Sequence, residues 1–412
     1  MFFRDLYNLD ESLNNLSIIY IELFQNRRLN VTDKIQIMLL TAYNAKDSAD
    51  LKKGQAKKIA QLFSDFVGQA RQSLHIAIYD FRLEEPEAQM VIDALNKAAE
   101  SGIDVRIAYF QPSKKHVSTS EFSLLGSDPA PGPNEAFFGR FHKDIPFKAI
   151  TGIEDLPSDV SSLPIEGGGH LMHSKYIIRD GLAPSAAVLT GSANFTTDAW
   201  TIQDNNIVTL ESQDIAGNYE TDFAELWEAG RIAGTGKNDH GETKIDDVDV
   251  DVDFAPGDGA AMDLNIASQI STAKNEIMLA SMVISSGAVL GALVDSIERG
   301  VKVSGVYDGP EMHQVMTDWE KSTRGTGQAK LAQWNAVKNN LVEKHSTPYS
   351  ENGPHDFMHN KVLVVDRQVV VTGSYNFSQN ATHNAENIIT LYDGAIACQY
   401  EQYIGDLVSK YK

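Results

Sequence analysis

The sequence predicts an α/β protein of two similar lobes, because one order of elements occurs twice along the chain. Residues 70–81 indicate a strand, and residues 87–110 indicate a helix, a glycine break and a second strand. Residues 273–284 and 288–309 repeat this order. In both copies a long irregular stretch follows, and after it comes a strand that carries a shared motif. Two such copies predict two lobes, each a β-sheet flanked by helices.

Glycines and a polar segment set the expected boundaries. Gly102 and Gly300 stand where the helix of each copy should end, because glycine readily adopts the left-handed conformation of a helix C-terminus. Residues 1–58 have no counterpart in the second half and are expected to form a helical N-terminal segment. We therefore expect the first lobe at 59–240 and the second lobe at 241–412.

The start of the second lobe is unusually acidic. Residues 248–254 alternate apolar side chains with aspartate, which is the period of a half-exposed strand. Aspartates of this stretch could also offer oxygen ligands to calcium. They are Asp247, Asp249, Asp251 and Asp253. The run lacks the glycine and the spaced glutamate of a calcium-binding loop, so we favour a solvated strand.

The overall composition is that of a globular protein with an acidic balance. The chain has 412 residues, a formal net charge of −21 and a single cysteine, Cys398. A lone cysteine cannot form an internal disulfide, which suits a reducing compartment, and we expect it in the core. The apolar runs at 17–24 and 35–43 are shorter than the roughly 20 residues that a membrane helix needs. We expect a cytoplasmic protein whose acidic surface repels polyanions at long range.

Two short motifs carry the chemistry. Each has a histidine, a lysine two residues later and an aspartate five residues after the lysine. The motif residues are His173, Lys175 and Asp180 in the first half and His359, Lys361 and Asp366 in the second. Side chains two residues apart on a strand point the same way, whereas each aspartate has the opposite parity and is expected to be structural. Burying a lysine beside a histidine is costly unless an anion meets them, so each lobe is expected to bind an anion.

A glycine-serine turn follows each motif strand. These turns supply Ser192 and Asn194 in the first half and Ser374 and Asn376 in the second. Hydroxyl and amide groups suit phosphate oxygens. Counted from the turn glycines without a gap, Asp204 falls opposite Glu386. A carboxylate is what a catalytic histidine needs to fix its tautomer, so both acids are predicted to orient the histidines.

Other interpretations of these histidines fit the duplication less well. A satisfied core histidine beside a lysine with a buried stem would explain one copy, but not two copies at matched spacing. His170 and His355 precede the motif histidines by three and four residues, which are spacings that can bind zinc on a helix. Here they precede strands instead. The sequence therefore predicts neither a metal site nor another cofactor.

The duplicated motif and the turns that follow it resemble the phospholipase D superfamily, over roughly residues 60–410. The resemblance implies two lobes with mixed sheets, related by a pseudo-twofold axis, that meet so that both motifs form one active site. It also implies metal-independent cleavage of a phosphodiester through a phosphohistidine. One motif histidine would attack phosphorus and the other, protonated, would donate to the leaving oxygen. The habit of the family favours His173 as the nucleophile, which the sequence alone does not decide.

The same resemblance implies roles for the remaining residues. The side chains that would hold the equatorial phosphate oxygens are Lys175, Lys361, Asn194 and Asn376. Ser192 and Ser374 would support them, while Asp204 and Glu386 would orient the histidines. The physical chemistry agrees, because phosphoryl transfer depends on positioning and on stabilising charge at the non-bridging oxygens.

Three functions fit these residues. The second motif, with phenylalanine after Asn376 and the phrase NAEN at 384–387, resembles bacterial nuclease-type members, so cleavage of nucleic acid is the first prediction. The alternative is a phospholipase D or phosphatidyltransferase that acts on phospholipid, with Trp200 facing the lipid. The third is a catalytically silent binding subunit, which the intact residues of both motifs disfavour. An acidic enzyme could also work in a complex in which a protein partner supplies the grip on nucleic acid.

Overall fold

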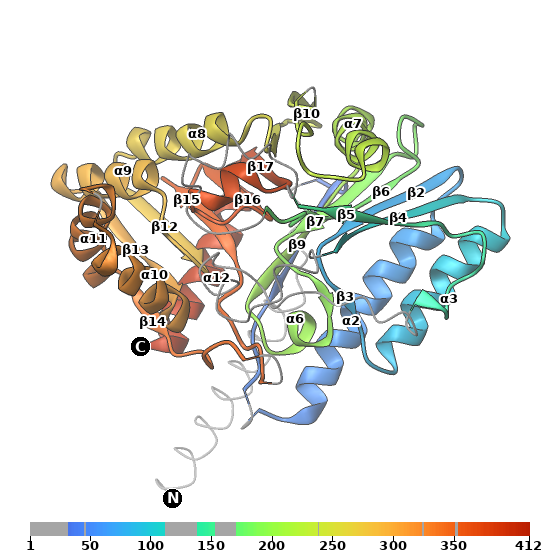
Figure 1. Ribbon diagram of the computed structural model, residues 1–412, viewed down its shortest axis with the longest axis horizontal. Coiled ribbons are helices and arrows are strands. Elements are labelled where there is room, and N and C mark those ends of the chain that lie inside the picture. The colour runs from blue at the N-terminus through green and yellow to red at the C-terminus, as the bar shows by residue number, and fades with distance from the viewer. Residues whose placement is uncertain are drawn as a thin grey trace, which may run out of the picture.

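Two β-sheets, one in each half of the chain, form the framework of the protein (Figure 1). The computed structural model describes residues 32–44, 47–111, 138–152, 170–237, 239–323, 325–350 and 353–412. Helices flank both sheets. The predicted α/β class with two similar lobes is therefore confirmed.

The first lobe is built on a mixed sheet. From edge to edge its strands are β1 (Ile35–Leu40), β9 (Asn205–Leu210), β7 (Ala187–Gly191), β6 (Lys175–Arg179), β2 (Ser73–Ile78), β4 (Asp104–Gln111) and β5 (Phe147–Thr151). The neighbours β2, β4 and β5 are parallel, and the other pairs are antiparallel. The helices are α2 (Ala49–Gly68), α3 (Glu87–Glu100), α6 (Thr197–Thr201) and α7 (Gln213–Ala229), and the short strands β3 (Phe81–Arg82) and β8 (Phe195–Thr196) pair outside the sheet.

The second lobe repeats this plan. Its strand order is β10 (Gly241–Ile245), β11 (Val248–Ala255), β17 (Glu386–Tyr392), β16 (Val369–Gly373), β15 (Lys361–Val365), β12 (Glu276–Ser281), β13 (Lys302–Asp308) and β14 (Val342–Lys344). Its helices are α8 (Gly259–Thr272), α9 (Gly287–Glu298), α10 (Gly309–Lys321), α11 (Gly325–Val337) and α12 (Gly394–Tyr411), with short 3₁₀ turns η2 (Lys338–Asn340) and η3 (Asn380–His383). Strands β17 to β14 of this sheet thus match β9 to β5 of the first.

The repeated strand, helix and strand lie where the sequence predicts them. In the first copy they are β2, α3 and β4, and in the second they are β12, α9 and β13. Gly102 and Gly300 follow the two helices with φ values of 83° and 84°, a backbone conformation that strains residues with a Cβ. The side-chain oxygen of Ser286 accepts a hydrogen bond from the backbone N–H of Val289 and so caps α9.

The expectation of a helical N-terminal segment over residues 1–58 is wrong for part of its length. Residues 1–31 lie outside the described residues, but residues 35–40 form β1, which pairs antiparallel with β9. Helix α2 then crosses the expected boundary at residue 58. Strand β1 occupies the place that β11 holds beside β17 in the other sheet. The described part of this segment therefore belongs to the first lobe, and the short apolar run was too brief to be told from a helix by periodicity.

The acidic stretch forms the predicted strand, β11, between β10 and β17. Its exposed face carries Asp249, whereas Asp253 is buried and bonds the Nδ1 of His240 through its Oδ1 at 2.7 Å. Within the described ranges, no group of three or more histidine, cysteine, aspartate or glutamate side chains is placed to hold a metal ion.

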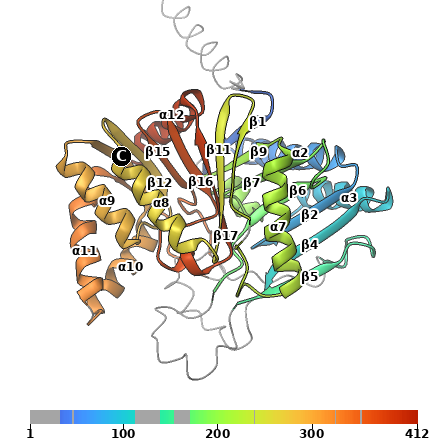
Figure 2. The same cartoon turned by 90° about the horizontal axis from the view of Figure 1, so that it is seen from above.

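Within the part of the chain that the structure describes, three apolar cores hold the elements together. One core packs α2 and α3 against the first sheet, and another packs α8, α9 and α11 against the second. Figure 2 shows α2 and α3 on the outer side of the first lobe, and α9 and α11 on the outer side of the second. The largest core joins the lobes, because it contains Tyr176 and Val188 from the first sheet, Val364 and Val370 from the second, and residues of α7 and α12. The motif strands are therefore covered on both faces.

Cys398 lies on α12 and is exposed, so the expectation of a core position is wrong. The apolar positions of that helix, such as Ile396, Ala397 and Tyr400, face the inter-lobe core instead. None of the helices in the described ranges combines the length and the apolar character needed to cross a membrane.

The motif aspartates tie each motif strand to the segment that precedes the neighbouring strand. Asp180 accepts hydrogen bonds from the backbone N–H groups of Arg71, Gln72 and Ser73 and from the hydroxyl of Ser185. Asp366 accepts from the equivalent backbone groups at 274–276. Both have positive φ values, 59° and 48°, in turns that leave the strand. Their positions and bonds support the structural role that the opposite parity predicts.

Replacing Asp180 by asparagine tests this role, because asparagine tolerates positive φ but carries no charge. We expect a loss of about 1–3 kcal/mol in the free energy of unfolding at pH 7. Burial raises the pKa of Asp180, but the bonds from Ser185 and the backbone outweigh it, so the pKa lies below its ordinary value. The stabilisation is then present above the ordinary pKa and disappears as pH falls through the folded-state pKa.

Urea unfolding at pH 7 and pH 3 measures this loss. The exposed Asp295 on α9 provides the control, Asp295→Asn, which removes the same charge without removing these hydrogen bonds. A loss of equal size at both pH values, or one no larger than in the control, would contradict the assignment.

Candidate active site

The two motif histidines lie at the junction of the lobes, and each is held by the opposite lobe. The backbone N–H of His173 donates to the carbonyl of Ala385 at 2.8 Å, and that of His359 donates to the carbonyl of Asp204 at 3.0 Å. Isolated bridges join Met172 with Ala385 and Asp204 with Met358. A short stretch of backbone pairing therefore fixes each motif to the residue that directly precedes a strand of the opposite half, β17 for the first motif and β9 for the second.

The side chains cross between the lobes in the same way. Nδ1 of His173 lies 2.8 Å from Oε2 of Glu386, and Nδ1 of His359 lies 2.8 Å from Oδ1 of Asn205. Both imidazoles are buried, with exposures of 1% and 0%. The partners are unlike: one histidine faces a carboxylate, whereas the other faces a neutral amide. Of the two acids expected to orient the histidines, Glu386 contacts a motif imidazole, whereas the carboxylate of Asp204 bonds other groups.

The partners also determine which ring nitrogen carries a proton. The Nδ2 group of Asn205 donates to the carbonyl of Ala199 and to Oε1 of Gln203, so its Oδ1 must face His359. On the other side, Nδ2 of Asn384 donates to Oε1 of Glu386. We infer from this network that Nδ1 is the protonated nitrogen of both rings, which assigns the chemistry to Nε2.

The structure corrects the prediction for Asp204, which lies beside the site and contacts neither histidine ring. Its Oδ2 forms a buried ion pair with Nζ of Lys344 at 2.7 Å and accepts a hydrogen bond from the hydroxyl of Tyr411 at 2.6 Å. Its Oδ1 accepts from the backbone N–H of Ala42. Asp204 thus joins β14, the end of α12 and the segment after β1 at the residue next to Asn205. It is a positioning residue rather than a partner of His359.

The two halves differ in length between the motif turn and the strand that follows it. Gly191 pairs with Ile207 and Gly373 pairs with Ile388, so the first half has one more residue between turn and strand. In this interval the first lobe has the α-helical turn α6 and the second has the 3₁₀ turn η3. Asn205 is therefore the counterpart of Glu386. Matching the sequences NIVTL at 206–210 and NIITL at 387–391 would have revealed the offset.

The two lysines are buried beside the histidines in equivalent arrangements. Nζ of Lys175 donates to the carbonyl of His173, and Nζ of Lys361 donates to the carbonyl of His359, both at 2.7 Å. Each side chain is 1% exposed, and the ammonium of Lys175 also lies 5.0 Å from the centre of the Tyr79 ring. The strands that begin at these lysines, β6 and β15, are buried throughout. Tyr79, which follows β2, lies outside the duplicated motif, so no sequence pattern pointed to it.

The turn residues line the same junction, but their hydroxyls are engaged within the protein. Ser192 donates to Oδ1 of Asn205, and its oxygen accepts from the backbone N–H of Asn206. Ser374 accepts the corresponding bond from the backbone N–H of Asn387 but donates to the backbone carbonyl of that residue. Both serines are fully buried, so their present bonds hold the strands that carry Asn205 and Glu386. The side chains of the turn asparagines, Asn194 and Asn376, are 3% and 4% exposed.

The other histidines do not join the motif residues in a metal cluster within the described ranges. Nε2 of His355 lies 3.0 Å from the carbonyl of Ser350, and its ring stacks on Phe357. His170 stacks on His383 across the lobes, with ring centres 5.4 Å apart. Burial, together with the charge of His383, lowers the pKa of His170 to about 4.

Comparison with known proteins identifies the family to which this chain belongs. A protein family described as "Cardiolipin synthase, PLD-like domain" matches residues 62–227 and 266–408, more than half of the chain. The chain belongs to the phospholipase D superfamily. Each of the two matched segments contains one copy of the motif. Each lobe is therefore a phospholipase D-like unit, as the resemblance of the motifs implied.

The individual relatives with about 30% sequence identity match a shorter part of the chain. Proteins named "Phospholipase D" from Rickettsia bellii and Rickettsia conorii are 31% and 30% identical over 138 residues, which is 33% of this chain and 59% of each relative. The match thus spans less than two thirds of their length. The solved phosphatidylserine synthase of Haemophilus influenzae has a TM-score of 0.57 at 11% identity and covers 91% of this chain and 86% of its own, a likeness of fold alone.

The unlike histidine partners lead to a pH prediction for Asn205→Asp. A carboxylate at this position would hold the protonated form of His359 more firmly, because it places a negative charge beside the imidazolium. If His359 is the acid, the alkaline limb of the profile of kcat against pH should move upward by about one pH unit or more. Hydrolysis of a phosphodiester with an alkoxide leaving group, which must be protonated as it departs, measures the shift between pH 5 and 10.

The control for this variant is Asn340→Asp, which adds the same charge at an exposed position of η2. We expect the control to leave the profile unchanged. An unshifted alkaline limb in Asn205→Asp, or an equal shift in both variants, would show that the amide does not set the acidity of the group that limits activity.

Proposed function

We propose that this chain is a phosphodiesterase that cleaves its substrate through a phosphohistidine on His173. The unlike partners of the histidines are the observation that best supports these roles. The carboxylate of Glu386 stabilises the positive charge that His173 gains when its Nε2 bonds to phosphorus. His359 faces the neutral amide of Asn205, so its imidazolium releases the Nε2 proton more readily than one paired with a carboxylate.

The reaction then has two steps. In the first, Nε2 of His173 bonds to phosphorus, the bond from phosphorus to the leaving oxygen breaks, and Nε2 of His359 gives its proton to that oxygen. In the second, neutral His359 takes a proton from water, the water oxygen bonds to phosphorus, and the phosphorus–nitrogen bond breaks. The product is a phosphomonoester, and both histidines return to their starting protonation states.

The charge on the non-bridging oxygens is met by the two lysines and the two turn asparagines. Each ammonium has three N–H donors, and one of them holds the side chain in place by donating to the carbonyl of the motif histidine. Donors fixed in a buried site stabilise developing charge strongly, because little reorganisation is needed during the reaction. The protein thus supplies the cationic groups that phosphoryl transfer requires, and we propose that cleavage proceeds without a metal ion.

We propose nucleic acid as the substrate, because the amino-acid sequence of the second motif resembles that of bacterial nuclease-type members of the superfamily. The net charge of −21 opposes long-range attraction of such a polyanion, so a protein partner that supplies a basic surface fits this proposal. The single cysteine suits a reducing compartment, and we place the enzyme in the cytoplasm.

The alternative substrate is phospholipid, which the names of the Rickettsia relatives favour. The expectation that Trp200 faces lipid is wrong, however. Its side chain is 1% exposed, and its Nε1 donates to the carbonyl of Asn194 at 2.9 Å. Trp200 therefore braces the first motif turn from within the core of the first lobe.

A substrate panel in excess chelator tests the function. We expect the purified chain to cleave labelled single-stranded DNA or RNA in EDTA, and His173→Ala and His359→Ala to lower the rate at least about 10²-fold. Phosphatidylcholine vesicles form the lipid arm, and duplex DNA forms a second nucleic-acid arm. Circular dichroism and unfolding of each variant establish that loss of activity is not loss of folding.

The outcomes separate the three functions. Release of the lipid head group without cleavage of nucleic acid would replace the nuclease by a phospholipase. Abolition of cleavage by EDTA would contradict the metal-free scheme. A folded protein that turns over none of these substrates, alone or with a nitrophenyl phosphodiester, would favour the silent binding subunit.

A further inference from the structure

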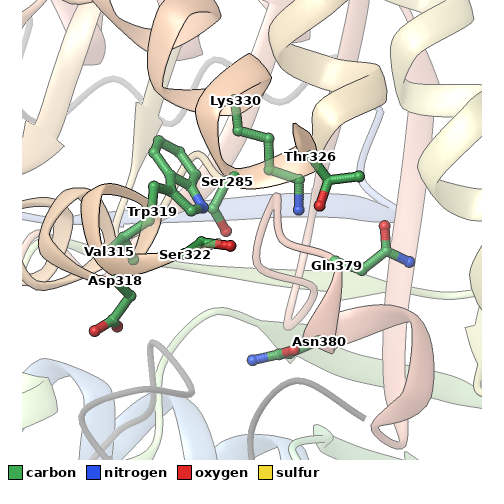
Figure 3. Close-up of a pocket in the computed structure, with 10 residues that line it drawn as sticks. Ser285, Val315, Asp318, Trp319, Ser322, Thr326, Lys330, Gln379 and Asn380 are labelled. Atoms are coloured by element: carbon green, nitrogen blue, oxygen red, sulfur yellow. The ribbon is translucent and has the colours of Figure 1, made fainter. Parts of the chain in front are cut away.

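A cavity of about 280 Å³ opens in the second lobe next to the turn that carries Asn376 (Figure 3). Its walls come from α10, α11 and the start of η3. Gln379 and Asn380 line it and follow Asn376 by only three and four residues, which places them within roughly 15 Å of that residue along the chain. The opposite wall includes Ser285, whose backbone N–H donates to the carbonyl of Phe377 at 2.7 Å. This hydrogen bond connects the wall of the cavity to the second motif turn.

Lys330 supplies the positive charge of this cavity. Figure 3 shows its side chain reaching from α11 into the space beside Thr326, with Gln379 on the other side. Among the residues that the structure describes, Lys330 forms no ion pair. A Cβ built on Gly287 would lie 3.6 Å from Cε of Lys330, so the lysine stem passes the first turn of α9. The positive end of that helix adds to the potential at the same place.

Two carboxylates bear on the charge of this cavity: Asp318 is part of its lining, and Asp263 is near enough to Lys330 for their charges to interact. Asp263 is buried, and its Oδ2 accepts a hydrogen bond from the hydroxyl of Ser286 at 2.7 Å. Burial raises the pKa of Asp263, while the bond from Ser286 and the charge of Lys330 oppose that rise. Asp318 accepts from Nε2 of Gln314 at 3.1 Å, and in Figure 3 its carboxylate points away from Lys330. The end of the cavity at Lys330 therefore suits an anion.

The remaining lining groups suit phosphate in particular. Hydroxyls of Ser285 and Thr326 and amides of Gln379 and Asn380 line the same cavity, with Thr326 next to the ammonium in Figure 3, and such donors recur in phosphate recognition. An anion held here would lie against the residues that directly follow the turn carrying Asn376. We propose that the cavity binds the phosphate adjacent to the scissile one in a nucleic-acid strand, with Lys330 as its charged contact. This inference rests on the proposed nuclease function.

The test compares substrates with one phosphate and with several. Lys330→Gln should raise the KM for a short single-stranded oligonucleotide about tenfold, because a charge-assisted contact is lost. It should leave kcat/KM for bis(p-nitrophenyl) phosphate unchanged, because that substrate has no second phosphate. The control Lys338→Gln removes the same charge from η2, outside the cavity lining, and should change neither value. Equal effects of Lys330→Gln on both substrates, or none on either, would overturn the proposal.

A binding measurement separates failure of this subsite from failure of the function. Thymidine 3′,5′-bisphosphate is titrated calorimetrically into His173→Ala with and without Lys330→Gln, so that no turnover is involved. We expect binding to weaken about tenfold when Lys330 is replaced. Unchanged binding would overturn the subsite even if the protein cleaves nucleic acid. Weakened binding in a protein that cleaves no nucleic acid would retain the phosphate subsite and reject only the nuclease.

Discussion

The exchange of contacts between the lobes is the constraint on which the rest of the structure depends. Each motif histidine is held by backbone and side-chain atoms of the opposite half, Glu386 for His173 and Asn205 for His359. Neither lobe alone could orient its own imidazole. The large core shared by α7, α12 and the inner faces of both sheets holds the lobes in register, so the apolar packing sets the geometry of the polar site.

The duplication also allows the halves to differ where the proposed chemistry needs them to. The proposed two-step phosphoryl transfer requires one histidine that carries positive charge while bonded to phosphorus and another that gives up a proton. One residue inserted before β9 places Asn205 opposite Glu386 and leaves the neighbouring Asp204 to pair with Lys344. The same backbone plan thus presents a carboxylate at one histidine and an amide at the other.

Much of this could be predicted from the sequence, because the signals were repeated. The periodicity of apolar residues and the glycines at 102 and 300 predicted the strands and helices of both halves. The duplicated motif predicted the site histidines and lysines. Strand β1 was missed because six residues do not establish a period. Asn205 was missed because a turn can absorb one residue without any change in its flanking sequence. The Asp204–Lys344 pair joins residues 140 positions apart, which local patterns cannot show.

The central claim is that His173 attacks phosphorus, while His359 donates a proton to the leaving oxygen and later accepts one from water. Trapping the covalent intermediate tests this claim most directly. Bis(p-nitrophenyl) phosphate has a leaving group that needs little protonation, so His359→Ala should still form the phosphoenzyme but hydrolyse it slowly. Rapid quenching and peptide mapping by mass spectrometry locate the phosphoryl group. The account predicts a nitrophenyl phosphoryl group on the peptide that contains His173, and none in His173→Ala. A modification on His359 of the unaltered protein, or turnover without any phosphohistidine, would contradict it.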